Sequence, residues 1–340
     1  MGRRWFGLVA AGAGLALAAA ACTGTAASGG SGGDGGEELS GDLFISGSST
    51  VEPITALVAE KFVAENPGVN VSVEGPGTGD GFELFCNGET AMSDASRRID
   101  PDEAAICEQN GIRYVELEVG IDGISVLTSP QNDAITCLDF KDIYALVGPE
   151  SEGFETWADA RPLAEEIGAA HADQFPDAPL TITAPGEESG TYDSFIELVL
   201  EGIAEERGQE ATTRPDYQSS PNDNVIIEGI AGTPTSFGWV GFSFYENNKD
   251  VVKAFEIDGG SGCVAPTEDT IADGSYPITR SLYIYPNLDR VAEDPALRAF
   301  VDFYLTDEGI VNSVAEVGYV TLPPDRIEAT RAAWAAAAGS

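Results

Sequence analysis

The chain has one histidine among its 340 residues, and no two cysteines have the C-x-x-C spacing of many zinc sites. A Ser-His-Asp or Cys-His catalytic arrangement would have to use His171, which lies in an acidic, loop-like segment with no nucleophile motif beside it. The single histidine and the lack of C-x-x-C pairs argue against a hydrolase and against a metalloenzyme. The sequence therefore predicts no enzymatic activity, no catalytic residue, no metal site and no cofactor.

Basic residues are also scarce. The chain has 17 Lys and Arg against 57 Asp and Glu, which gives a formal net charge of −40 at pH 7. Nucleic acid and anionic membrane surfaces are poor partners for such a protein. Anion binding is still compatible with this charge, because a recessed site works through its local donors.

Long apolar runs are missing after residue 21, so we expect no membrane-spanning helix in the rest of the chain. Residues 5–21 are apolar and follow Arg3 and Arg4, which is typical of a signal peptide over residues 1–21. Arg3-Arg4-Trp5-Phe6 also resembles a twin-arginine signal, and the export route stays open between this and the general one.

The end of the apolar run, Ala19-Ala20-Ala21-Cys22, resembles a bacterial lipobox with alanine in place of the usual leucine. Cys22 is therefore predicted to be lipidated. Residues 22–41 contain mostly small residues and are predicted to be a flexible tether. These features together predict an exported protein anchored to the outer face of the cytoplasmic membrane.

Four cysteines remain after Cys22, an even number for an oxidising compartment. Two disulfides are expected, with three possible pairings. We favour Cys86–Cys107, which closes a short loop, together with Cys137–Cys263, which closes a long one.

The sequence does contain one local pattern in several copies: an apolar run, a turn of small residues and then a helix. Residues 43–45 are apolar, residues 46–50 are a Gly/Ser/Thr turn, and Ile54, Val58 and Phe62 then recur at helical spacing. The first backbone N–H groups of such a helix have no intrahelical partner and carry the positive end of its dipole, so they favour an anion. The alternative is an ordinary Ser/Thr N-cap.

Further copies strengthen the anion hypothesis. Residues 75–82 form a second small-residue turn before a helix, and residues 185–193 form a third. A fourth and weaker candidate is residues 219–224. Three helix starts aimed at one cleft suit a tetrahedral oxyanion, whose oxygens accept several hydrogen bonds at once.

Alternating strands and helices predict an α/β fold with two lobes. Short strands are expected near residues 114–117 and 124–127, with Asp122 and Gly123 between them. Another strand is expected over residues 237–245, and a long strand over residues 276–285 returns the chain to the first lobe. We predict lobe 1 from residues 42–127 plus 276–340, and lobe 2 from residues 128–275.

The ordered set of motifs resembles the phosphate-binding proteins of phosphate-specific ABC transporters, the PstS-like branch of the type II periplasmic binding proteins. The resemblance implies mixed sheets flanked by helices, with the ligand in the cleft between two lobes. It also implies a monomer that hands inorganic phosphate to a membrane permease. The matching segments are Gly47-Ser-Ser-Thr-Val-Glu-Pro, Gly77-Thr-Gly-Asp-Gly-Phe, Ala95-Ser-Arg-Arg-Ile, Ser189-Gly-Thr-Tyr-Asp-Ser-Phe, Cys263-Val-Ala-Pro-Thr, Tyr276-Pro-Ile-Thr-Arg and Val317-Gly-Tyr-Val.

The resemblance also implies a set of ligand-binding residues, contributed by the three turns. The set is Ser48, Ser49, Thr50 and Val51 from the first turn, Thr78 and Gly79 from the second, and Ser189, Gly190 and Thr191 from the third.

Two departures from the family pattern concern charge. Arg97 stands where the best-known members have the aspartate that accepts the phosphate proton, and Pro185 stands where they have an arginine. We therefore expect Arg97 to supply the positive charge, since guanidinium binds oxyanions bidentately. Asp193 is the first candidate for the proton acceptor, although it is equally explained as a first-turn acid at a helix start. Behind it come Asp94, Asp80 and Glu188.

These departures keep other functions open. A receptor for sulfate or molybdate has the same fold and would need no proton acceptor. An exported phosphate-ester hydrolase is disfavoured by the single histidine. A phosphate sensor or a surface adhesin with this fold remains a further alternative.

Overall fold

The computed structural model describes residues 39–187 and 189–339, and the predicted signal peptide and Cys22 lie outside them. The first strand–turn–helix units fold as predicted, and β1 pairs in parallel with both β2 and β3. Their bounds are β1 (Gly41–Gly47), α1 (Glu52–Glu65), β2 (Val69–Glu74), α2 (Thr78–Cys86), β3 (Met92–Ala95) and α3 (Pro101–Gln109).

A large mixed sheet organises the chain, in the order β2-β1-β3-β12-β4-β8-β6-β7, with β9 also paired to β4. β6 is parallel to β7 and β8, whereas β12 is antiparallel to β3 and β4. The predicted mixed α/β fold is therefore confirmed. The remaining bounds are β4 (Leu117–Thr128), β6 (Thr181–Ala184), β7 (Gln218–Ser219), β8 (Ser236–Gly241), β9 (Lys253–Ala254) and β12 (Thr279–Pro286).

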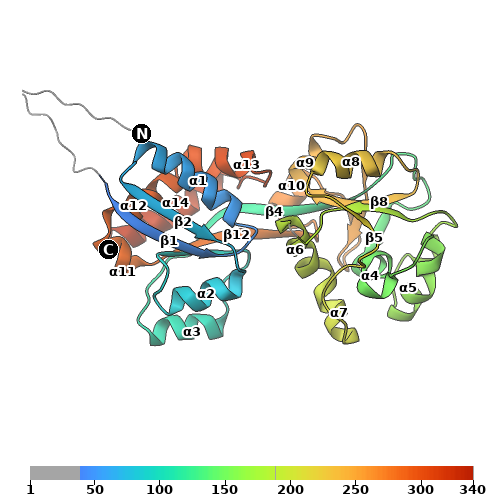
Figure 1. Cartoon of the computed structure of the whole chain (residues 1–340), viewed down its shortest axis with the longest axis horizontal. Coiled ribbons are helices and arrows are strands. Elements are labelled where there is room, and N and C mark those ends of the chain that lie inside the picture. The colour runs from blue at the N-terminus through green and yellow to red at the C-terminus, as the bar shows by residue number, and fades with distance from the viewer. Residues whose placement is uncertain (1–38, 188, 340) are drawn as a thin grey trace, which may run out of the picture. The chain divides into compact units, whose positions relative to one another are not determined.

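β4 and β12 run between two groups of elements in Figure 1. One group holds α1–α3 and α11–α14, and the other holds α4–α10 with the small sheet β11-β10-β5. The bounds of that small sheet are β5 (Cys137–Asp139), β10 (Glu256–Asp258) and β11 (Cys263–Val264).

Helices cover both groups of elements. They are α4 (Phe140–Val147), α5 (Arg161–Ile167), α6 (Gly190–Phe195), a π-helical turn (Ile196–Leu200), α7 (Glu201–Arg207), α8 (Asp223–Ala231), α9 (Phe242–Glu246), α10 (Glu268–Ala272), α11 (Leu288–Glu293), α12 (Pro295–Tyr304), a second π-helical turn (Glu308–Ser313), α13 (Val314–Glu316) and α14 (Pro324–Ala338). None of the described helices is long and apolar enough to cross a membrane.

Two sequence predictions were wrong in detail. Asp122 and Gly123 do not separate two strands but lie inside the continuous strand β4, where Gly123 leaves room for Ile271. A Cβ atom on Gly123 would lie 2.9 Å from the Ile271 Cδ1 atom. The strand predicted to reach residue 245 ends at Gly241, because its pairing with β4 ends there and residues 242–246 form α9.

One continuous hydrophobic core links the two groups of elements. It extends from Leu43 in β1 through Ile124 in β4 to Trp157, which is fully buried. Phe195 stacks on Trp239 with ring centroids 4.1 Å apart, which fixes the helix that begins at α6 against β8.

Both disulfides have the favoured pairing, Cys86–Cys107 and Cys137–Cys263. The first joins α2 to α3, and the second joins β5 to β11 in the small sheet. Their sequence separations are 21 and 126 residues.

The longer disulfide should contribute more to stability, because it restricts the unfolded chain more strongly. Chain-entropy scaling predicts that Cys137→Ala with Cys263→Ala lowers the free energy of unfolding by about 5 kcal/mol. Denaturant titration of wild type and double variant measures this difference. A reductant added to the double variant opens the remaining bridge and should lower the free energy by about 3 kcal/mol more. A double variant as stable as wild type would contradict the prediction.

Candidate functional site

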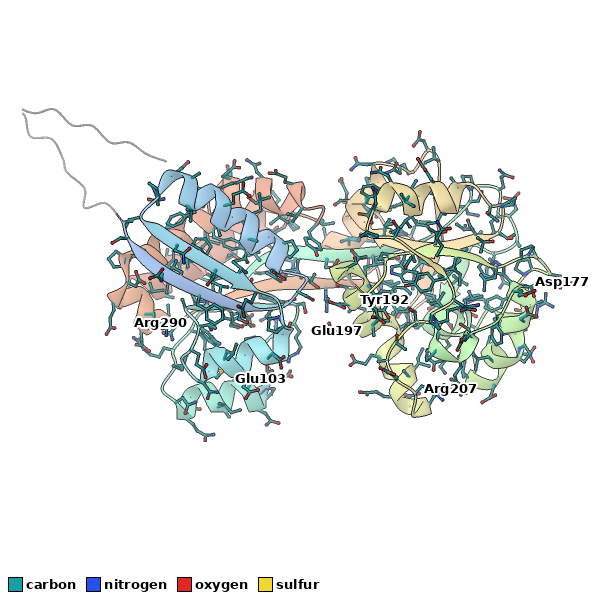
Figure 2. All side chains as sticks on the ribbon, viewed as in Figure 1. Glu103, Asp177, Tyr192, Glu197, Arg207 and Arg290 are labelled. Carbon is teal, nitrogen blue, oxygen red and sulfur yellow. A yellow bond between two sulfur atoms is a disulfide. The ribbon has the colours of Figure 1, made fainter. Side chains whose placement is uncertain are left out.

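A cavity of about 570 Å³ brings residues of all three predicted turns together. Tyr192 and Glu197, labelled in Figure 2, line it from α6 and the π-helical turn that follows. The other lining residues are Ser48, Ser49, Thr50, Gly75, Pro76, Gly77, Thr78, Gly79, Ser96, Arg97, Asp193, Ile196, Glu201, Ala211 and Arg280.

The first turn is held by backbone contacts to β3. The Ser48 N–H donates to the Asp94 carbonyl at 2.9 Å, and the Ser48 hydroxyl accepts from the Thr50 N–H at 3.2 Å. Ser48, Ser49 and Thr50 line the cavity at the start of α1, as the anion hypothesis requires. Val51 differs, because its side chain is buried in the core and its N–H donates to the Ser48 carbonyl at 3.1 Å.

The second turn lies directly against the first. The Gly77 N–H donates to the Gly47 carbonyl at 2.9 Å, and a Cβ on Gly81 would lie 2.4 Å from the Gly47 Cα. Only glycine permits this approach of α2 to the end of β1. Thr78 and Gly79 line the cavity, and the Thr78 hydroxyl accepts from the Ser96 N–H at 3.1 Å.

The third turn reaches the first from the other group of elements. A Cβ on Gly190 would lie 3.3 Å from the Ser49 carbonyl oxygen, so the start of α6 packs on the first turn. The Ser49 hydroxyl donates to Asp193 Oδ2 at 2.9 Å. Ser189 caps α6 by accepting from the Thr191 N–H at 3.2 Å. From this turn Tyr192 and Asp193 line the cavity, whereas the predicted ligands Ser189, Gly190 and Thr191 are not among its lining residues.

Arg97 lines the cavity, but its guanidinium is already paired. Nη1 and Nη2 each donate to Glu103 at 2.8 Å, and Nη1 lies 3.3 Å from Asp100. Glu103 also accepts from the Asp100 N–H at 2.9 Å, which fixes the acceptor in place. Arg97 is therefore a positioned cation whose charge is largely compensated.

Sequence reasoning gave no role to Arg280, which also lines the cavity. It lies on β12 opposite Asp122 of β4, and its side chain is only 8 % exposed. Its Nη2 donates to the hydroxyls of Thr50 at 3.0 Å and Ser194 at 2.6 Å. The available signal was the scarcity of arginine and its place in the matching segment Tyr276-Pro-Ile-Thr-Arg.

The four candidate proton acceptors lie in different places. Asp193 lines the cavity, whereas Asp80 is exposed and outside it. Asp94 is fully buried behind the first turn, where burial raises its pKa to about 7 and the charge of Glu52 acts in the same direction. Glu188 lies outside the described residues.

Two groups of side chains in the described part of the chain have ligand atoms close enough for a metal ion, but the cysteines of one, Cys137 and Cys263 beside His171, are joined in a disulfide. Atoms of Asp139, Asp142 and His171 lie within 4.8 Å of one another. Their carboxylates, however, already accept from backbone N–H groups of Asp139, Asp142, Ala170 and His171. We assign no metal to this group.

Comparisons with known proteins agree with this architecture. A family model described as a PBP superfamily domain matches residues 26–308. Protein SphX of Synechocystis sp. is 37% identical over 290 residues, which cover 85% of this chain and 80% of that protein. Phosphate-binding protein PstS of Staphylococcus saprophyticus is 34% identical over 329 residues, covering 94% and 91%.

The chain is a PstS-like member of the PBP superfamily. A crystal structure of a possible phosphate binding protein from Planctomyces limnophilus matches this PBP-superfamily chain with a TM-score of 0.79 at 31% identity, over 88% of this chain and 99% of that one. Family membership therefore rests on sequence and on fold alike.

The buried carboxyl of Asp94 makes the stability of this PstS-like protein depend on pH. An unfolded Asp loses its proton near pH 3.8, whereas folded Asp94 keeps it to about pH 7, so unfolding releases a proton between these values. The free energy of unfolding should fall as pH rises through this window, by roughly 4 kcal/mol for a shift of this size.

Asp94→Asn removes this titration. We expect the variant to match wild type near pH 4 and to be more stable at pH 8, measured by denaturant unfolding at both pH values. Asp177→Asn, at an exposed aspartate labelled in Figure 2, is the control and should follow wild type. Parallel pH curves for Asp94→Asn and wild type would refute the assignment.

Proposed function

We propose that this protein captures inorganic phosphate outside the cytoplasm and delivers it to the permease of an ABC transporter, without catalysis. The observation that carries the proposal is the cavity in which three small-residue turns meet. Its relatives, among them the phosphate-binding protein PstS of Staphylococcus saprophyticus, support phosphate as the ligand. A tetrahedral oxyanion accepts hydrogen bonds from helix starts and hydroxyls together.

The proposed donors come from the three turns and from one arginine of the wall. They are Ser48, Ser49, Thr50, Thr78, Gly79, Arg97, Ser189, Gly190 and Thr191. Val51 is not among them, because its N–H donates to the Ser48 carbonyl and its side chain is buried. Asp193 is proposed as the acceptor of the phosphate proton, because it is the candidate carboxylate that lines the cavity. Ser49 donates to only one of its oxygens, Oδ2.

We further propose two lobes, residues 42–127 plus 276–340 and residues 128–275, that close over the ligand. Lobe closure would then depend on the contacts between the first and third turns. A signal peptide over residues 1–21, a lipid on Cys22 and a tether over residues 22–41 would hold a monomer at the outer face of the membrane.

Calorimetry with phosphate and with sulfate between pH 5 and 9 tests the proposed ligand. We expect phosphate to bind and sulfate to bind far more weakly, since fully deprotonated sulfate has no proton to donate to a site carboxylate. Sulfate binding as tight as phosphate binding would favour the general oxyanion receptor. No phosphate binding at any of these pH values would refute the proposal.

Asp193→Asn tests the proton acceptor. Removing a carboxylate that faces a sulfate oxygen relieves a like-charge contact, so the ratio of sulfate to phosphate dissociation constants should fall by at least about tenfold. Asp80→Asn removes an equal charge outside the cavity and serves as the control. An unchanged ratio in Asp193→Asn would assign the role to another group.

A further inference from the structure

Arg280 occupies a position in which a buried guanidinium faces the proposed phosphate cavity. It is fixed from behind by β4, where Asp122 lies directly opposite it in the antiparallel ladder. Arg280 Nε and Asp122 Oδ2 are 3.5 Å apart, and neither atom has a hydrogen-bond partner within the described residues. Burial raises the pKa of Asp122, and the charge of Arg280 opposes this rise. The pair therefore holds the Nε edge toward β4.

The other edge of the guanidinium points to residues of the cavity. Nη2 donates to Thr50, a proposed ligand, and to Ser194, which follows Asp193 in the chain. Nη1 donates to Glu197, whose side chain is 43 % exposed. This carboxylate presents an anionic oxygen to Arg280 from the wall of the same cavity.

The two arginines of the cavity differ in how easily their partners can be replaced. Arg97 is bound through both Nη atoms to Glu103, which is 20 % exposed and is itself held by a backbone N–H. Arg280 meets its buried partner at the Nε edge, and its Nη1 partner is half-exposed and solvated. An exposed ion pair is worth little and is readily exchanged for a stronger acceptor.

We propose that Arg280 is the main cation that binds phosphate, that Asp122 positions it, and that the Glu197 carboxylate competes with phosphate for its Nη1 edge. The inference rests on the proposed phosphate function and adds to it the source of the positive charge. Phosphate with two oxygens on a guanidinium forms the stronger, bidentate pair.

The first test compares arginine variants by calorimetry with inorganic phosphate at pH 7.5. Arg280→Gln should weaken binding by about 100-fold or more, since it removes a buried charged donor. Arg97→Gln should weaken binding by about tenfold or less, because its charge is compensated by Glu103. Arg280→Lys should bind with an intermediate affinity. Equal losses in both Gln variants, or a larger loss in Arg97→Gln, would overturn the proposal.

The second test isolates the competition by Glu197 and leaves Arg280 intact. Glu197→Gln should tighten phosphate binding by about threefold or more, because a competing carboxylate is removed. Glu201→Gln is the matched control: it removes an equal charge from the same cavity wall without a bond to Arg280. Glu201→Gln should therefore increase the affinity for phosphate by less than Glu197→Gln does. Equal increases in affinity would show that both carboxylates only repel phosphate by their charge, and would refute the competition of Glu197 for Arg280.

Asp122 is tested through its coupling to Arg280. Asp122→Asn should weaken phosphate binding in the wild-type background and should change it little when Arg280 is Gln. An independent structural role would give the same loss in both backgrounds. Thermal unfolding without phosphate shows whether each variant folds. If Arg280→Gln does not fold, the test rests on Arg280→Lys and Glu197→Gln. Wild-type affinity for phosphate in both of these variants would overturn the inference.

These outcomes separate the inference from the proposed function. If the wild-type protein binds no phosphate, the proposed function fails before any variant is compared. If wild type binds phosphate and Arg280→Gln binds it equally well, the function stands and the role of Arg280 is refuted.

Discussion

The antiparallel pairing of β4 with β12 is the interaction on which the rest of the structure depends. These strands join the two groups of elements, and their register places Arg280 opposite Asp122 beside the cavity. Because side chains alternate between the faces of a strand, a slip of one residue would turn Arg280 away from Thr50 and Ser194. The strand pairing thus fixes how the two groups of elements are connected and where the positive charge of Arg280 lies.

Close backbone contacts bring the turns together. Gly81 lies against Gly47, where a side chain would keep the first two turns apart, and Gly190 packs closely on the carbonyl of Ser49. Each turn presents neutral donors at the start of a helix. Such donors act over short distances, which is why a protein with a formal net charge of −40 is compatible with a local anion site.

The hydroxyls proposed to bind the ligand also join the walls of the cavity. Ser49 reaches Asp193, and the Thr50 and Ser194 hydroxyls are 3.0 Å apart. An oxyanion in the cavity would exchange these protein–protein hydrogen bonds for protein–anion bonds with the same groups. Ligand binding and the closing of the walls would therefore be coupled through shared donors.

The sequence by itself determined what depends on neighbouring residues: the turns at Ser48, Thr78 and Ser189, the alternation of strands and helices, and an even set of cysteines outside Cys22. Only the tertiary structure decided which side chains face the cavity. It paired Arg97 with Glu103, buried Asp94 of β3 behind the first turn, and brought Arg280 from β12 to Thr50. Local spacing carries no information on the contact of Arg280 with Thr50, because it arises from strand register and packing between segments that are far apart in the chain.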